Sequence, residues 1–66
     1  MKEYDVVEFT RAIELEGLHI PAGTQGTLLD AYPDNHYLME LGDEFDHATP
    51  MVSTEYLKVV WEHKEG

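Results

Sequence analysis

GLHIPAGTQGTLLDAYPDNHYLMEL, residues 17–41, is the stretch of sequence that decides the fold. A glycine-punctuated loop leads into an apolar strand, and a Pro-Asp-Asn turn joins this strand to a second one. We expect a tight turn over residues 21–24, because proline presets φ at the second turn position and Gly23 can supply a positive φ. Gly26 stands just inside the next strand, where a missing side chain permits the sharp coiling that small barrels require.

The second turn of this stretch predicts a β-hairpin. Pro33, Asp34 and Asn35 occupy consecutive positions between two apolar runs, and these residue types favour tight hairpin turns. The run that follows, residues 36–41, alternates in the manner of a return strand. We therefore expect two antiparallel strands joined by this turn.

Three shorter runs complete the expected strands. Residues 5–9 alternate so that Val7 and Phe9 share one buried face. The run 47–52 is weaker, because its proline cannot donate a ladder hydrogen bond and so implies a sheet edge or a bulge. Residues 57–61 alternate again and form the expected closing strand.

Two connecting segments carry their own signals. Residues 12–18, AIELEGL, fit either a short helix or an ordered excursion whose apolar side chains fold back onto the sheet. Gly17 inside the segment, with proline and glycine soon after it, favours the excursion. Residues 53–56 suit a single 3₁₀ turn in which hydroxyl groups cap free amides.

Together these features predict one all-β domain over residues 1–66, a small SH3-like five-stranded barrel or roll. A long ordered loop follows its first strand, and a short 3₁₀ turn precedes its last. Short strands spaced about 8–12 residues apart are typical of such folds. A chain of this length buries only about 60% of the surface that its unfolded form exposes, so oligomerisation would add stability.

Composition narrows the classes of function and compartment. Fourteen acidic and four basic residues give a formal charge of −10, which repels phosphate backbones, so we expect no direct nucleic-acid binding. Without cysteine there is no disulfide or thiolate metal site, and a reducing cytoplasm fits best. The N-terminus is acidic and has no long apolar run, so we expect a soluble protein without a secretory signal or membrane span.

Three segments resemble one bacterial family, that catalogued as domain of unknown function 4926 (DUF4926). They are YDVVEFTRAI (residues 4–13), residues 17–41 and VSTEYLKVV (residues 52–60), and the middle one is the most specific. The resemblance implies an SH3-like barrel without known enzymatic activity and supplies no catalytic residue. The chain departs from the family pattern at Leu38 and at Val60-Trp61, which put apolar surface where solvent is expected.

No group of residues has the spacing that catalysis or metal binding requires. None of the histidines stands at H-x-H or H-x₃-H spacing, and residues 42–47, GDEFDH, lack the ligand alternation and length of a calcium loop. Ser53 is the only serine and is better explained as a turn cap, and we expect Asp5 and the other strand acids to face outward. The sequence therefore predicts no enzyme activity, no metal and no cofactor.

The remaining signal is apolar and aromatic. Alternation predicts that four apolar strand residues lie on the faces away from the core, and a contiguous apolar patch on so acidic a protein marks an interface. Tyrosine and tryptophan side chains are either further members of that interface or fillers of a thin core. The candidate interface residues are Val6, Leu28, Tyr32, Leu38, Val60 and Trp61.

These observations leave three hypotheses for function. The first is a noncatalytic interaction module that binds a protein partner, or itself, through apolar strand faces or an open sheet edge. The alternative is an antitoxin or immunity-type inhibitor whose charge attracts a basic toxin or mimics nucleic acid. The third is an enzyme or small-ligand binder with a pocket around Tyr32, His36 and Tyr37.

Overall fold

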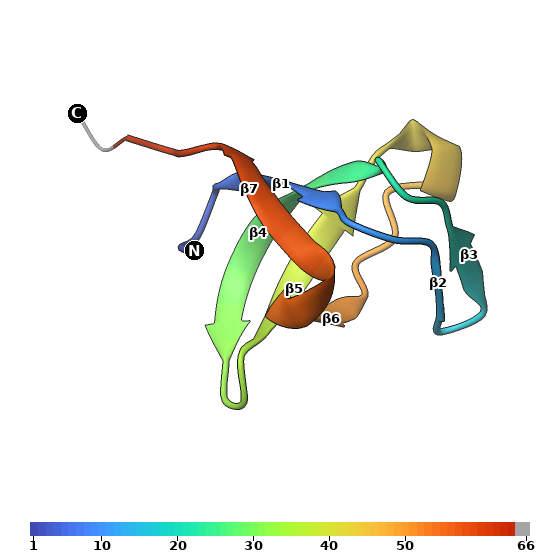
Figure 1. Ribbon diagram of the computed structural model, residues 1–66, viewed down its shortest axis with the longest axis horizontal. Coiled ribbons are helices and arrows are strands. Elements are labelled where there is room, and N and C mark those ends of the chain that lie inside the picture. The colour runs from blue at the N-terminus through green and yellow to red at the C-terminus, as the bar shows by residue number, and fades with distance from the viewer. Residues whose placement is uncertain (65–66) are drawn as a thin grey trace.

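The strands alternate with tight turns along the whole described chain, as the computed structural model shows for residues 1–64 (Figure 1). Within this range no segment forms an α-helix, so the helix alternative for residues 12–18 is wrong. The elements are β1 Val6–Phe9, β2 Ile13–Leu15, β3 Leu18–Ile20, β4 Gln25–Tyr32, β5 His36–Leu41, the 3₁₀ turn η1 Asp43–Phe45, β6 Met51–Ser53, the 3₁₀ turn η2 Thr54–Tyr56 and β7 Leu57–Trp61.

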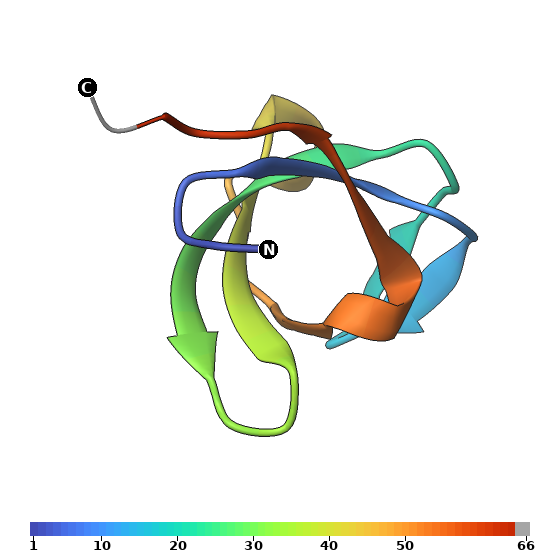
Figure 2. The same cartoon turned by 60° about the vertical axis from the view of Figure 1, so that its left-hand side comes forward.

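The main sheet has five antiparallel strands in the order β6-β5-β4-β1-β7, and β2 pairs with β3 in a separate two-stranded sheet. The main sheet is strongly curved, so that its strands wrap around a common interior (Figure 2). Its two edge strands do not pair with each other in the described chain. The prediction of an all-β fold is therefore confirmed, and the described strands form an open sheet.

Side-chain alternation along β1 supplies the centre of the core. Val7 and Phe9 are buried, whereas Val6 and Glu8 are only half-buried, as the alternation of residues 5–9 predicts. The core packs apolar side chains from both sheets, which is the main favourable term in a domain this small. Its members are Val7, Phe9, Ile20, Leu28, Met39, Leu41, Val52 and Leu57.

The segment after β1 is a hairpin rather than the long loop that the sequence predicts. Ile13 pairs with Ile20 across β2 and β3, and Gly17 at the turn has a φ of 80°. Ile20 is fully buried, and the other apolar side chains of the hairpin pack against the core. The predicted packing is confirmed, but the description as a loop is wrong, because backbone pairing satisfies the amides of this segment.

Both turns of the fold-deciding stretch form. The amide of Thr24 donates to the Pro21 carbonyl at 3.2 Å, and Gly23 has a φ of 88°. Pro21 thus takes the first turn position instead of the second. In the β4–β5 hairpin Asp34 and Asn35 have φ values of 63° and 58°, which is the left-handed conformation that these residue types tolerate.

Leu28 corrects the predicted faces of β4. Its side chain is fully buried, whereas the sequence predicts it on the face away from the core. Both faces of this strand carry apolar residues, so alternation does not reveal which of them is inside. Gly26 is buried on the same side. A register shift between Leu28 and Asp30 interrupts the pairing with β5, which resumes at the pair Asp30–Leu38 and continues to the hairpin turn.

The strand predicted over residues 47–52 is observed only as the shorter β6, which begins at Met51, whereas its edge position and the 3₁₀ turn after it agree with the prediction. β6 lies at one edge of the main sheet, as the proline in the run 47–52 indicates. The Pro50 carbonyl accepts from the Met39 amide at 3.0 Å, so the pairing with β5 extends beyond the strand itself. In η2 the Ser53 side chain accepts from the Glu55 amide at 3.4 Å, which confirms the capped 3₁₀ turn.

Candidate interaction surface

Asp5 is buried, contrary to the expectation that it faces outward. Only 2% of the residue is exposed. Its Oδ1 accepts from Lys2 Nζ at 2.9 Å and from the His63 backbone N–H at 2.8 Å, and its Oδ2 accepts from the Lys2 backbone N–H at 3.1 Å. This carboxylate therefore holds the segment after β7 against the N-terminal segment.

The ionised form of Asp5 is the stable one in this setting. Burial by itself raises the pKa of a carboxyl group, because the charged form loses its solvation. The hydrogen bonds from Lys2 and from the His63 amide, together with the charge of Lys2, outweigh burial and hold the pKa of Asp5 below its ordinary value. The connection that Asp5 makes between the N-terminal segment and His63 is therefore intact at neutral pH.

Three rings gather where these two segments meet. The Tyr4 and His63 rings lie edge to face, with centroids 5.5 Å apart, and the Trp61 ring is 6.0 Å from that of His63. Tyr4 is 52% exposed, Val60 43% and Trp61 55%. We call Tyr4, Val60, Trp61 and His63 the β7 patch. It presents large apolar side chains to solvent at the end of an edge strand.

A groove beside the patch runs between the N-terminal segment and the residues after β7. Its volume is about 730 Å³, and its walls come from residues 2–4 and 62–64. Charged side chains of both signs stand next to the rings here, and Lys2 Nζ lies 4.0 Å from Glu62 Oε2. The groove therefore has an apolar wall and a mixed-charge rim, as protein interfaces commonly have.

The four basic residues of this acidic protein lie on β7 or close to the residues just before and after it. Lys58 is on the strand and contacts Glu8 at 3.2 Å. The Arg11 guanidinium stands 4.6 Å above the ring of Tyr56, the residue before β7. Lys2 lies beside Glu62, just after the strand, and Lys64 follows two residues later. Basic and acidic side chains are therefore mixed along this edge, and the rest of the described chain contains no lysine or arginine.

The structure brings together only part of the predicted interface. Val60 and Trp61 lie in the β7 patch, and the half-buried Val6 pairs with Trp61. Tyr32 is 45% exposed but lies at the hairpin end of β4, five residues beyond Thr27, the β4 partner of Val6. Leu38 is half-buried on β5, away from β7, and Leu28 is in the core.

Tyr4 and His63 are the members that sequence reasoning missed. Each lies outside any alternating run, so periodicity gives no signal for either residue. Their proximity depends on the buried Asp5, and the sequence gives no indication that this carboxylate is buried.

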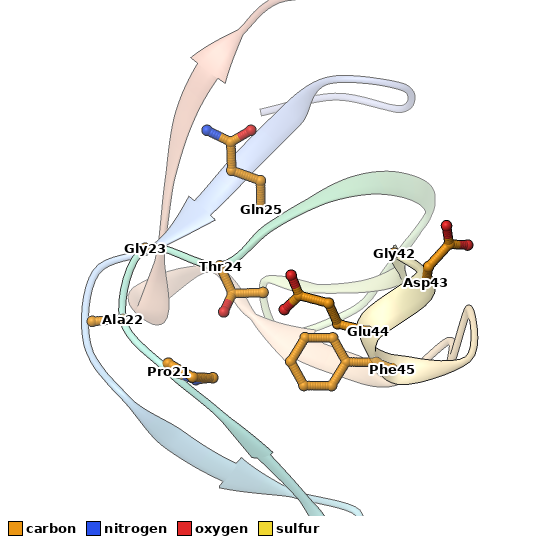
Figure 3. Close-up of a pocket in the computed structure, with 9 residues that line it drawn as sticks. All are labelled: Pro21, Ala22, Gly23, Thr24, Gln25, Gly42, Asp43, Glu44 and Phe45. Carbon is orange, nitrogen blue, oxygen red and sulfur yellow. The ribbon is translucent and has the colours of Figure 1, made fainter.

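A second depression lies between the turn after β3 and η1 (Figure 3). Its volume is about 600 Å³, and its walls come from residues 21–25 and 42–45. The side chains of Glu44 and Phe45 face the Pro21–Thr24 side, whereas Asp43 points away. One carboxylate beside one ring offers a contact surface but no set of catalytic groups.

A cluster of four acidic residues, Glu40, Asp43, Glu44 and Asp46, lies next to this depression. Two of them flank His47, whose Nε2 is 2.5 Å from Asp43 Oδ1 and whose Nδ1 is 3.9 Å from Glu40 Oε2. Among residues 1–64 no three side chains of the ligating types are arranged to hold a metal ion. The cluster is an exposed anionic surface.

No helix in residues 1–64 is long and apolar enough to cross a membrane. Comparison of the chain with protein-family models, with curated proteins and with solved structures found no match. The resemblance to DUF4926 therefore stays a prediction.

Proposed function

We propose that this chain is a noncatalytic, SH3-like interaction module that binds a protein partner, or a second copy of itself, through the β7 patch. The observation that carries the proposal is the joint exposure of Tyr4, Val60 and Trp61 beside the only basic side chains of the protein. Large apolar side chains that gather on the surface of a soluble domain mark an interaction site.

The SH3-like description is part of the same proposal. It is supported by the strand order, by the β2–β3 hairpin between β1 and β4, and by the 3₁₀ turn that leads into β7. Residues of the DUF4926 resemblance form β1, the fold-deciding hairpin and β7, so the chain is proposed as a divergent member of that family.

Substitution at the patch tests this function. Trp61→Lys puts a charge at the centre of the patch. Tyr32→Lys is the matched control, since it replaces a similarly exposed aromatic residue that lies outside the patch, at the hairpin end of β4. Both self-association and retention of proteins from a bacterial lysate are measured for the two variants. We expect Trp61→Lys to lose the self-association or the protein binding that Tyr32→Lys retains. A Trp61→Lys protein that keeps every contact of the unmodified chain contradicts the proposal.

A second candidate function follows from the acidic cluster. Glu40 and Asp43 are exposed by 47% and 92% of their side chains, and such a surface attracts a basic protein. We propose an inhibitor of a basic toxin or nucleic-acid-binding protein as the alternative. Its complex would weaken steeply between low and high salt, because screening acts on exposed charges. A complex that salt does not weaken argues against it.

A further inference from the structure

We infer that the partner of the β7 patch is a second copy of this chain, bound with its β7 antiparallel to the first. This inference rests on the proposed function, which it makes specific. It follows from three features of β7, namely its free backbone edge, its exposed apolar side chains and its pattern of charge.

The other edge of the sheet already has one of its donors bonded. The Met51 amide of β6 donates to Glu16 Oε2 at 3.0 Å. The turn between β2 and β3 thus reaches β6 and satisfies an edge donor that would otherwise be available for strand pairing. Of the two edges of the main sheet, β7 is the one that this hairpin leaves accessible.

The alternation of hydrogen bonds along β1 shows which backbone groups of β7 point away from the sheet. The Thr10 amide donates to the Tyr56 carbonyl at 2.8 Å, whereas the Phe9 amide donates to the Thr24 carbonyl at 2.9 Å. Bonded positions alternate in an antiparallel pair, so Val7 bonds toward β4. Since Val59 is the β7 partner of Val7, the N–H and C=O of Val59 point away from β1. They are the groups that a second strand would bond.

A bulge next to this position exposes the apolar side chains. Val7 pairs with Val59 but Val6 pairs with Trp61, so β7 has one extra residue, Val60, at the register shift. Bulges re-aim side chains and shorten regular pairing. The backbone contribution is therefore limited to the first part of β7, and Val60 and Trp61 supply most of the apolar contact.

Charge selects a second copy over an anionic partner. The lysines of this edge already stand beside acids, Lys2 beside Asp5 and Lys58 beside Glu8, so the edge is not a net basic patch. It is instead the part of the described surface where two molecules of charge −10 meet with the least repulsion.

The direction of pairing follows from the two ends of β7. Arg11 lies at the start of the strand and Glu62 just after its end. An antiparallel arrangement brings Glu62 of each copy toward Arg11 of the other, whereas a parallel one brings like ends together. A register that puts Lys58 opposite its own copy is disfavoured by like charges, and a register centred on Val59 avoids this.

The surface area indicates a reversible dimer. A standard interface of about 800 Å² per partner would take about a fifth of the 4297 Å² surface of the monomer, which is more than one short strand offers. We therefore expect association that depends on protein concentration.

Trp61 is the only tryptophan, so its fluorescence reports directly on the patch. Emission maximum and acrylamide quenching are recorded over a concentration series, in parallel with sedimentation equilibrium. A blue shift and reduced quenching that track formation of a dimer are expected. Monomers up to millimolar concentration, with Trp61 still quenched, overturn the inference. If Trp61-dependent capture of another protein persists in that case, the proposed function survives and only the second copy is wrong.

A charge exchange tests the antiparallel arrangement. Arg11→Glu places like charges together across the dimer axis and should weaken dimerisation about tenfold, and adding Glu62→Arg in the same chain should restore it. Val59→Pro removes an outward N–H that the monomer does not use within its sheet, so it should abolish the dimer while the far-ultraviolet circular dichroism is unchanged. Failure of the double variant to recover, with both variants folded, refutes the arrangement.

Discussion

The carboxylate of Asp5 accepts a hydrogen bond from the backbone amide of His63, across 58 residues of sequence, at 2.8 Å. The same oxygen accepts from Lys2 Nζ at 2.9 Å. A buried charge is tolerated only where it is well hydrogen-bonded, and here those bonds hold the N-terminal segment and His63 together beside β7. The geometry of the exposed β7 patch thus depends on a residue that is itself hidden.

Asp5→Asn should therefore destabilise the fold. The amide keeps the shape of the side chain but replaces an acceptor with a donor that faces other donors, at a cost of about 1–3 kcal/mol. Urea unfolding followed by circular dichroism measures the free energy of unfolding. Asp30→Asn, at an exposed position of β4, is the control and should change it little. Equal effects of the two substitutions contradict the role assigned to Asp5.

The depressed pKa of Asp5 predicts the direction of the pH dependence. A carboxyl group with a lower pKa in the folded than in the unfolded state stabilises the fold above its unfolded pKa, and that stability is lost as pH falls through the folded pKa. Unfolding should therefore become easier below about pH 4, near the ordinary pKa of aspartate. Asp5→Asn should show a shallower loss between pH 5 and about pH 2. An unchanged acid profile rules out this contribution.

Leu28 and Leu29 provide a matched test of the strand faces. Leu28→Ala removes a fully buried side chain and should cost about 2–5 kcal/mol. Leu29→Ala deletes the same atoms from a half-buried position and should cost less. Thermal and urea unfolding of the two variants give the difference. A larger loss of stability for Leu29→Ala than for Leu28→Ala would indicate that Leu28 lies on the outward face, as simple alternation predicts.

Most strands and turns of this fold are readable from the sequence because each depends on local chemistry. Turn residues such as Asn35 adopt the left-handed conformation that they tolerate, and alternation in β1 follows from its single buried face. Alternation fails in β4, where both faces carry apolar residues and only packing against β5 reveals that Leu28 is inside. The pairing of β2 with β3 is missed because each strand has only three residues.

The candidate site is less predictable, because it joins distant parts of the chain. Val60 and Trp61 are adjacent in sequence and were accessible to pattern reasoning. Tyr4 and His63 meet only through the bonds of Asp5, and the alignment of basic side chains depends on where Lys2 and Arg11 lie relative to β7. Such proximity arises from sheet topology, which composition and periodicity do not encode.

Gly26 shows why this strand needs a residue without a side chain. A Cβ atom there would lie 2.6 Å from the Met39 Cε and 2.8 Å from the Glu40 carbonyl oxygen. Methionine can move but the backbone oxygen cannot, so Gly26→Ala should destabilise by about 1–3 kcal/mol. At Gly42 an added Cβ meets nothing within 4 Å, so Gly42→Ala should stay within about 0.5 kcal/mol. Comparable unfolding curves for the two variants would disprove the steric argument.

Glu16 should protect the β6 edge through its bond to the Met51 amide. Glu16→Ala removes the acceptor and leaves that edge donor to water or to another strand. Hydrogen exchange of the Met51 amide should therefore accelerate, while the free energy of unfolding falls by no more than about 1 kcal/mol, since the contact is exposed. Glu14→Ala, on the same hairpin with its side chain 85% exposed, is the matched control. An uncovered β6 gives the sheet a second accessible edge, so Glu16→Ala should also form species larger than a dimer at high concentration. An unaltered exchange rate of the Met51 amide would show that Glu16 does not protect this edge.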